Sequence, residues 1–277
     1  MKKILVVEDD HAIRLLLTQL MKAAGYSVES AGDGVEGLQK LKKKKYDLML
    51  LDIWMPRLNG LEVLAKLRDQ PSRPKVIVMT ADNTPETLLT AVREQAYHYL
   101  PKPFQPNVLE DLVRRALSAK ADAAPIEVLS ARPDWVELLV PCDMEVVDRI
   151  QSFLTHLEVG LPNEVRESVG RAFHELLVNA IEWGGQLDPT RKVRISYLRA
   201  RRMLLYRIAD PGKGFRLEEM SHAAVNNPPD QPFEHLRFRE DKGLRAGGFG
   251  ILMTRATVDE LLYNEARNEV VFVKYLD

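Results

Sequence analysis

The stretch YDLMLLDIWMPRLNG, residues 46–60, decides the fold of the first half of the chain. Its central run LMLL is apolar at every position, so a strand formed there would be buried on both faces. Such strands are typical of a parallel sheet that helices cover on each side. Asp52 follows this run directly. We therefore expect a buried parallel strand with a carboxylate at its carboxyl end.

Four more apolar runs surround this stretch: ILVVE from Ile4, YSVESA from Tyr26, KVIVMTA from Lys75 and AYHYLPKP from Ala96. Between the runs, apolar residues recur at helical spacing over 12–24, 35–43, 61–68, 85–94 and 107–119. Alternating strands and helices predict an α/β fold. We expect a five-stranded parallel sheet of the flavodoxin-like kind, with strand order 2-1-3-4-5.

Polar side chains stand at the carboxyl ends of these strands, where an open parallel sheet binds its ligands. They are Glu8, Asp9 and Asp10 after the first strand, Asp52 after the third, Thr80 after the fourth and Lys102 after the fifth. With order 2-1-3-4-5 the first and third strands are neighbours, so their acids converge. Converging carboxylates repel unless a hard cation neutralises them, and Mg²⁺ suits oxygen ligands. A lysine and a threonine hydroxyl at the same edge could hold a phosphoryl group on one of the acids.

Residues 1–120 resemble the receiver domain of two-component response regulators. The resemblance lies in ILVVEDD, the AGDG turn at Ala31, LLDIWMPRLNG, VMTA and YLPKPF. It implies that Asp52 accepts a phosphoryl group from a sensor histidine kinase. It also implies a Mg²⁺ ion on Glu8, Asp9 and Asp52, with the backbone carbonyl of Trp54 as a further ligand.

The same resemblance implies a switch around the phosphorylated residue. Thr80 and Lys102 would contact the phosphoryl oxygens, and Tyr99 would change rotamer together with Thr80.

The pattern changes beyond Pro125, after the small and polar segment SAKADAAP, which predicts a linker. A length of 277 residues suits two domains of roughly 150 residues each, and we place them at 1–120 and 121–277. In the second domain we expect strands in IEVLSA and VELLVP, helices over 143–157 and 163–183, and a hairpin of VRISYLRA and RMLLYRIAD. After an irregular run to residue 248 come a helix from near Gly250 and the strands VDELLYN and NEVVFVKYL. This pattern predicts an α+β fold with one layer of sheet and one of helices.

Two motifs of the second domain bring polar groups and glycines together. The predicted helix RAFHELLVNAIEW carries Glu175 and Asn179 four residues apart, and therefore on one face. The motif DPGKGF puts Asp210 at a strand end, with Gly212 and Gly214 behind it, where backbone can approach a ligand closely.

A third motif, AGGFGIL, puts Gly247, Gly248 and Gly250 at the start of a helix. Exposed N–H groups and the helix dipole make such a start an anion site.

Together the three motifs resemble the nucleotide-binding boxes of the GHKL-type ATPases, which have the Bergerat fold and include histidine kinases, gyrase and the anti-sigma-factor serine kinases. The resemblance implies ATP with Mg²⁺: Asn179 on the metal, Asp210 on the adenine amine, and the glycines beside purine and phosphates. Glu175 would take the hydroxyl proton of a substrate serine or threonine. Lys242 and Arg245, in the loop before the glycines, would touch the γ-phosphate.

The composition excludes several other classes of protein. Thirty-nine basic residues against 40 acidic ones leave a formal charge of −1, which gives no reason to expect nucleic acid or anionic lipid as the main partner. Cys142 is the single cysteine, so an intrachain disulfide and a cysteine-based zinc site are excluded. No apolar run approaches the roughly 18 residues that span a bilayer, and MKKILVVEDD lacks a secretory apolar segment. We therefore expect a cytoplasmic protein.

These observations lead to one hypothesis and two alternatives. In the first, the receiver controls an ATP-binding output domain that phosphorylates a partner, such as an anti-sigma-factor antagonist. In the second, the output domain binds ATP and sequesters a sigma factor or another regulator without phosphoryl transfer. The third is a histidine kinase fragment that uses the same ATP site. Glu175 favours catalysis, because a pure binding module needs no general base. The sequence leaves open a homodimer, the partner's identity and the sign of control.

Overall fold

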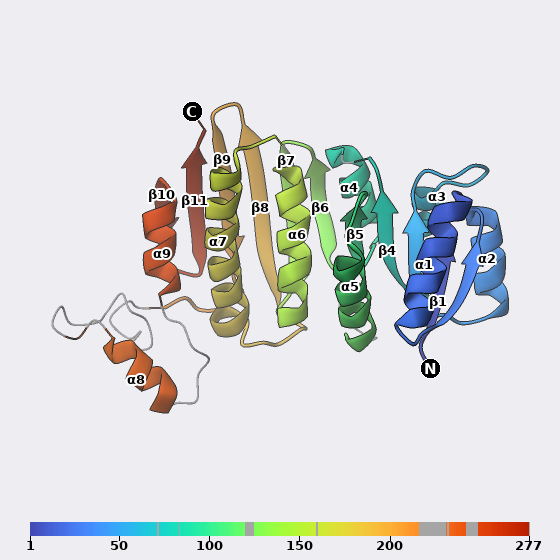
Figure 1. Cartoon of the computed structure of the whole chain (residues 1–277). Helices are drawn as coiled ribbons and strands as arrows, with labels where there is room; N and C mark the ends of the chain where they lie inside the picture. The colour runs from blue at the N-terminus through green and yellow to red at the C-terminus, as the bar shows by residue number, and fades with distance from the viewer. Residues whose placement is uncertain are drawn as a thin grey trace. The chain divides into compact units, whose positions relative to one another are not determined.

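The computed structural model describes residues 1–70, 72–82, 84–119, 125–158, 160–215, 231, 233–241 and 249–276. The chain forms two compact units, Met1–Ala123 and Ala124–Asp277 (Figure 1). Each unit has its own sheet and its own core, and each is described by itself.

The first unit is a five-stranded parallel sheet with the order β2-β1-β3-β4-β5, which confirms the predicted α/β topology. Its strands are β1 (Lys3–Val7), β2 (Ser27–Ala31), β3 (Leu48–Asp52), β4 (Lys75–Thr80) and β5 (His98–Pro101). Its helices are α1 (His11–Ala23), α2 (Gly34–Lys43), α3 (Gly60–Leu67), α4 (Pro85–Arg93) and α5 (Pro106–Ser118).

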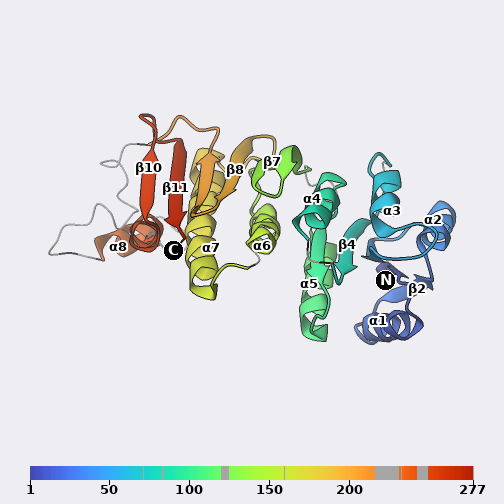
Figure 2. The same ribbon diagram turned by 90° about the horizontal axis from the view of Figure 1, so that it is seen from above.

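Helices cover both faces of this sheet. Figure 2 shows α1 and α5 on one face and α2, α3 and α4 on the other. Every residue of β3 is buried, as its apolar run predicts. One side of the core is made by alternate residues of β1 and β3, such as Ile4 and Leu48, which pack with Leu17 of α1 and Leu109 of α5. Rigid packing on both faces holds the carboxyl ends of the strands in a fixed arrangement.

The second unit is a six-stranded antiparallel sheet with the order β10-β11-β9-β8-β7-β6. Its strands are β6 (Glu127–Arg132), β7 (Trp135–Pro141), β8 (Lys192–Ala200), β9 (Met203–Ala209), β10 (Glu260–Tyr263) and β11 (Glu269–Tyr275). Its helices are α6 (Val147–Leu157), α7 (Asn163–Asn179), α8 (Glu234–Asp241) and α9 (Gly250–Thr257), with a short 3₁₀ turn, Met144–Val146, before α6.

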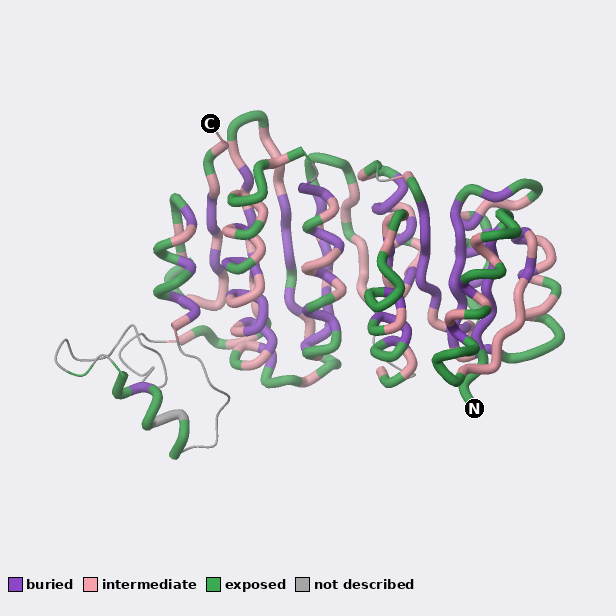
Figure 3. Tube along the Cα trace, viewed as in Figure 1, coloured by how far each residue is buried: buried purple, intermediate pink, exposed green. Residues whose placement is uncertain are grey.

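Helices α6, α7 and α9 lie on one face of this sheet, so the unit has the two layers that the sequence predicts (Figures 1 and 2). Buried segments alternate with partly exposed ones along the strands (Figure 3). The core between the layers is aromatic: the ring of Tyr206 stacks on Phe272 at 4.8 Å and contacts Tyr197 at 5.1 Å and Phe173 at 5.4 Å. These contacts join α7 to three strands.

The helix predicted over 163–183 changes its winding before its end. The α-helical part stops at Asn179, and Ala180–Gly184 form a π-helical turn in which the N–H of Gly185 donates to the carbonyl of Ala180. Such turns are rare and frequently occur at functional sites. No described helix is long and apolar enough to cross a membrane.

Candidate functional site

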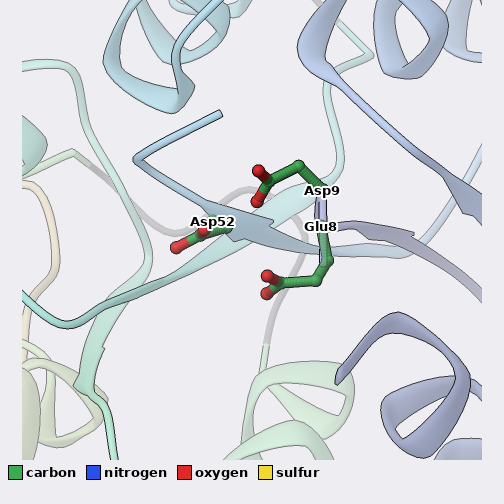
Figure 4. A group of neighbouring side chains, drawn as sticks. All are labelled: Glu8, Asp9 and Asp52. Carbon is green, nitrogen blue, oxygen red and sulfur yellow. The ribbon is translucent and has the colours of Figure 1, made fainter. Parts of the chain in front are cut away.

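Three carboxylates meet at the carboxyl edge of the first unit. Val7 of β1 pairs with Leu51 of β3, so the next residues along the two segments, Glu8 and Asp52, are neighbours. Carboxylate oxygens of Glu8, Asp9 and Asp52 all lie within 4.8 Å of one another (Figure 4). Glu8 and Asp52 are 1% and 5% exposed, whereas Asp9 is open to solvent.

Lys102 reaches into this cluster from the end of β5. Its Nζ lies 2.8 Å from Oε2 of Glu8 and 3.1 Å from Oδ1 of Asp52. Burial raises the pKa of both carboxyl groups, and the lysine opposes that rise. Burial would lower the pKa of Lys102, but the two carboxylates outweigh it, so the pKa of the lysine is raised. One cation among three acids leaves excess negative charge, which a divalent cation would offset.

Asp10 does not join the cluster, although it follows the same strand. Its Oδ1 accepts hydrogen bonds from the N–H groups of Ala12 and Ile13, at 2.8 and 2.9 Å, and so caps α1. The N–H of Ile13 contributes most to lowering the pKa of this carboxyl group. The start of the helix therefore determines which of three consecutive acids are free to bind a ligand.

Thr80 is the last residue of β4, Tyr99 lies in β5, and both are buried. The Thr80 hydroxyl oxygen accepts the N–H of Asp82 at 3.1 Å, and its carbonyl accepts the N–H of Lys102 at 2.8 Å. The Tyr99 hydroxyl donates to the carbonyl of Asp82. The backbone after β4 thus links the predicted switch residues to one another.

Trp54 shows a contact that the sequence did not indicate. Its side chain is 59% exposed and hydrogen-bonds to the carboxylate of Asp82. Burial would raise the pKa of Asp82, but hydrogen bonds from Thr87, Thr84 and Trp54 outweigh it and lower the pKa.

In the second unit, Glu175 and Asn179 are both half-buried on α7, and Glu175 lies against the start of α9. A Cβ atom added to Gly250 would stand only 2.4 Å from Oε2 of Glu175. Glu175 also lines a pocket of about 140 Å³, together with Gln151 of α6, Arg171, Ala172 and His174 of α7, and Met253, Thr254 and Thr257 of α9. The structure therefore brings the predicted base together with the first residue of α9.

Asp210, at the end of β9, lies against the π turn. A Cβ atom added to Gly184 would stand 2.2 Å from Cγ of Asp210, so only glycine permits this approach. The N–H of Gly212 donates to Oδ1 of Asp210 at 2.7 Å. Burial raises the pKa of Asp210, while this N–H and the charge of Arg191 oppose the rise. Gly184 is not among the predicted site residues, although the sequence carries two consecutive glycines at 184 and 185.

Of the other predicted glycines near the ATP site, the structure describes Gly214 but not Gly247 or Gly248. Gly214 has a φ of +83°, and a Cβ atom there would stand 1.6 Å from the carbonyl oxygen of Ala266, so the position requires glycine. Lys242, Arg245, Gly247 and Gly248 lie outside the described residues.

Two known families match this chain, one on each side of the boundary between its two units. Residues 4–114 match the family described as response regulator receiver domain. Residues 140–274 match the family described as histidine kinase-like ATPase domain.

The curated relatives match this chain over only about half of their own length. Response regulator MprA of Mycobacterium leprae (strain TN) is 41% identical over 113 residues, which cover 41% of this chain and 48% of the relative. Response regulator MprA of Mycobacterium avium (strain 104) is 42% identical over 113 residues, with the same coverage of 41% and 48%. The chain thus spans about half the length of these relatives.

Among the solved structures that are similar to part of this chain are two response regulator proteins. One is a CheY-like response regulator receiver domain protein from Methanospirillum hungatei JF-1, with 32% identity, 42% of this chain and 94% of that chain covered, and a TM-score of 0.41. The other is the response regulator protein TrrA from Thermotoga maritima in complex with Mg²⁺ and BeF, with 36% identity, 42% and 99% covered, and a TM-score of 0.39.

Proposed function

We propose that this chain, which joins a response regulator receiver domain to a histidine kinase-like ATPase domain, couples phosphorylation of Asp52 to phosphoryl transfer from ATP to a partner protein. A sensor histidine kinase would supply the phosphoryl group of Asp52. The target of the ATPase domain would be a serine or threonine, as in the anti-sigma-factor kinases that its motifs resemble.

The acidic cluster supports the first step. A compact set of carboxylate oxygens is the donor set that Mg²⁺ prefers, so Glu8, Asp9 and Asp52 fit the ion. When bound, Mg²⁺ would offset the charge of the carboxylates and of the incoming phosphoryl group. An oxygen of Asp52 would bond to phosphorus as the phosphorus–nitrogen bond of the donor histidine breaks. Lys102, already 3.1 Å from Asp52, would then bind a phosphoryl oxygen.

The position of Glu175 carries the proposal for the second step. Its carboxylate lies beside Gly250, at the start of a helix. The first backbone N–H groups of a helix have no acceptor within the helix, so they suit an anion such as the γ-phosphate. Glu175 would take the proton of the substrate hydroxyl as the hydroxyl oxygen bonds to the γ-phosphorus and ADP leaves. Asn179, one turn further on, would hold the Mg²⁺ of ATP, and Asp210 would accept a hydrogen bond from the adenine amine.

The test uses the full chain, γ-labelled ATP, Mg²⁺ and candidate partner proteins, followed by acid treatment. We expect acid-stable label on the partner, because phosphoserine and phosphothreonine survive acid whereas phosphohistidine does not. Glu175→Ala should keep nucleotide binding and lose about 10²–10⁴-fold of the transfer rate, because a general base acts in the transition state. Glu164→Ala is the matched control, since Glu164 is an exposed acid in the first turn of the same helix.

Three other outcomes contradict the proposal in different ways. Acid-labile label would indicate a histidine kinase. ATP binding without any label on a partner would indicate a binding module. Absence of ATP binding would show that the proposed ATP site of the second unit is wrong.

A further inference from the structure

The loop that follows β9 is held at two consecutive carbonyl groups by side chains from the segments before β8 and β11, the two strands that flank β9. Nη2 of Arg191 lies 2.6 Å from the carbonyl oxygen of Pro211. Nδ2 of Asn268 lies 3.0 Å from the carbonyl oxygen of Gly212. Neither residue belongs to the three motifs that indicate an ATP site.

Arg191 is placed by the short loop between the π turn and β8. Oδ1 of Asp188 accepts from both the N–H and the hydroxyl of Thr190, at 2.9 and 2.7 Å, and the N–H of Arg191 donates to the Asp188 carbonyl. The carbonyl of Arg191 in turn accepts the N–H of Cys142. With its backbone fixed, the guanidinium also approaches the carbonyl of Gly185, with Nη1 at 3.5 Å. Arg191 therefore ties the end of the π turn to the loop after β9.

Asn268 is placed by the turn between β10 and β11. Its carbonyl accepts the N–H of Asp210 at 2.8 Å, and its side-chain oxygen accepts from Nδ2 of Asn264 at 2.8 Å. Because the side-chain oxygen is occupied in this way, the side-chain nitrogen faces Gly212.

These contacts converge on the carboxylate of Asp210. The Pro211 carbonyl and the Gly212 N–H belong to one planar peptide group, so they point in opposite directions. Arg191 binds the oxygen of this peptide group. On the other side of the group, the N–H of Gly212 donates to Oδ1 of Asp210 at 2.7 Å. A charged donor on the oxygen both orients the peptide and polarises it, which strengthens the hydrogen bond on the other side.

We infer that Arg191, with Asn268, is a positioning residue that holds the Asp210 carboxylate in the orientation needed to accept the exocyclic amine of adenine. This inference rests on the proposed role of Asp210. It predicts that Arg191 acts on recognition of the base rather than on the triphosphate, because its contacts lie in the loop that carries Asp210 and on the π turn beside it.

The test compares two nucleotides by calorimetry on the full chain with Mg²⁺: ATP and purine riboside triphosphate, which lacks the exocyclic amine. The unmodified chain should prefer ATP by roughly 10- to 100-fold, the size of one hydrogen bond to a charged group. Arg191→Ala should bring this preference close to one while affinity for the analogue changes less than about twofold. Arg191→Lys keeps a charged donor and should restore part of the preference. Asn268→Ala, with Arg191 unchanged, should also reduce the preference for ATP.

The matched control is Arg194→Ala. Arg194 stands three residues further along the chain, in β8, and is ion-paired with Glu137 at 2.7 Å. Its loss should leave the affinities for both nucleotides unchanged. Thermal melting of each variant checks that it is folded at the temperature of the titration.

Each outcome decides the inference. Equal weakening of both nucleotides in Arg191→Ala and Asn268→Ala would mean that the two residues only maintain the fold. An unchanged preference in both variants would overturn the inference as well. Lack of an ATP preference in the unmodified chain would instead show that the proposed role of Asp210 is wrong, which is a separate failure.

Discussion

Asp52 is the residue on which the receiver site depends, because it is the predicted phosphoryl acceptor. Asp52→Asn should abolish labelling of the first unit by a small phosphodonor such as acetyl phosphate, because the amide cannot form the acyl phosphate. Labelling of the unmodified chain should also require Mg²⁺, since the nearby acids otherwise repel the donor. Asp47→Asn is the control: Asp47 precedes the same strand and accepts the N–H of Lys3. Labelling that persists in Asp52→Asn would overturn the assignment.

Glu158 is a buried carboxyl group in the second unit, and it predicts a pH dependence of stability. It is 2% exposed and accepts the hydroxyl of Tyr206, and its other oxygen has no hydrogen-bond partner among the described residues. Burial raises its pKa from 4.5 to about 7, against the opposing effects of Tyr206, Arg166 and Arg199. Tyr197, which contacts Tyr206, also faces this group.

The sign follows from the raised pKa. The folded state binds the proton more tightly than the unfolded state does, so this contribution to stability is complete below pH 4.5 and is lost as the pH rises through about 7. Glu158→Gln should therefore resemble the unmodified chain near pH 5 and exceed its free energy of unfolding near pH 8 by on the order of 3 kcal/mol. Urea unfolding at both pH values measures this, with Glu265→Gln, an exposed acid, as control. A difference between the Glu158→Gln and unmodified chains that does not grow with pH would contradict the prediction.

At the scale of elements, a substitution at the contact between α7 and α9 should change activity without changing stability. A Cβ atom at Gly250 would stand 2.4 Å from the end of the flexible Glu175 side chain. Gly250→Ala should therefore displace the carboxylate rather than the helices. We expect a free energy of unfolding within about 0.5 kcal/mol of the original and a transfer rate lowered at least tenfold.

Gly170, in the middle of α7, is the matched position for this comparison. Apart from the backbone of α7 itself, the nearest described atom to a Cβ atom there would be Nε2 of Gln151, at 3.7 Å. Gly170→Ala should raise the free energy of unfolding by about 0.5–1 kcal/mol through helix propensity and leave transfer unchanged. Urea unfolding and single-turnover transfer measure both variants. A lower stability in Gly250→Ala with normal transfer would mean that Glu175 is not at the reacting centre.

At the scale of the whole molecule, the prediction is a coupling between the two units. Beryllofluoride, a phosphoryl mimic, should bind at Asp52 and change ATP affinity or partner phosphorylation by about 5- to 150-fold, the usual range of allosteric coupling. Calorimetry and transfer assays with and without beryllofluoride measure the change, and Asp52→Asn should show no response. Equal values in both states would mean that the receiver does not control this ATPase domain.

Much of the fold and of the receiver site could be predicted from the sequence because the signals are local. The LMLL run and helical spacing identify strands and helices, and parallel strands bring their carboxyl ends to one edge. These two patterns are enough to place Asp52, Lys102 and Thr80 at one edge of the sheet. The resemblance to receiver domains already separates Asp9 from Asp10, and the capping of α1 by Asp10 gives the physical reason.

The sequence by itself determined the two domains' fold classes, the strand order of the receiver and the residue types at its strand ends. Tertiary structure alone decided three contacts. They are the approach of Gly184 in the π turn to Asp210, the hydrogen bond from Arg191 to the Pro211 carbonyl, and the burial of Glu158 beside Tyr206. The physical reason is range: periodicity and capping act within a few residues, whereas Arg191 and Pro211 are 20 apart and Glu158 and Tyr206 are 48 apart in the chain. Such contacts form only when sheet register and helix packing bring distant segments together, and no local pattern records which side chains will then meet.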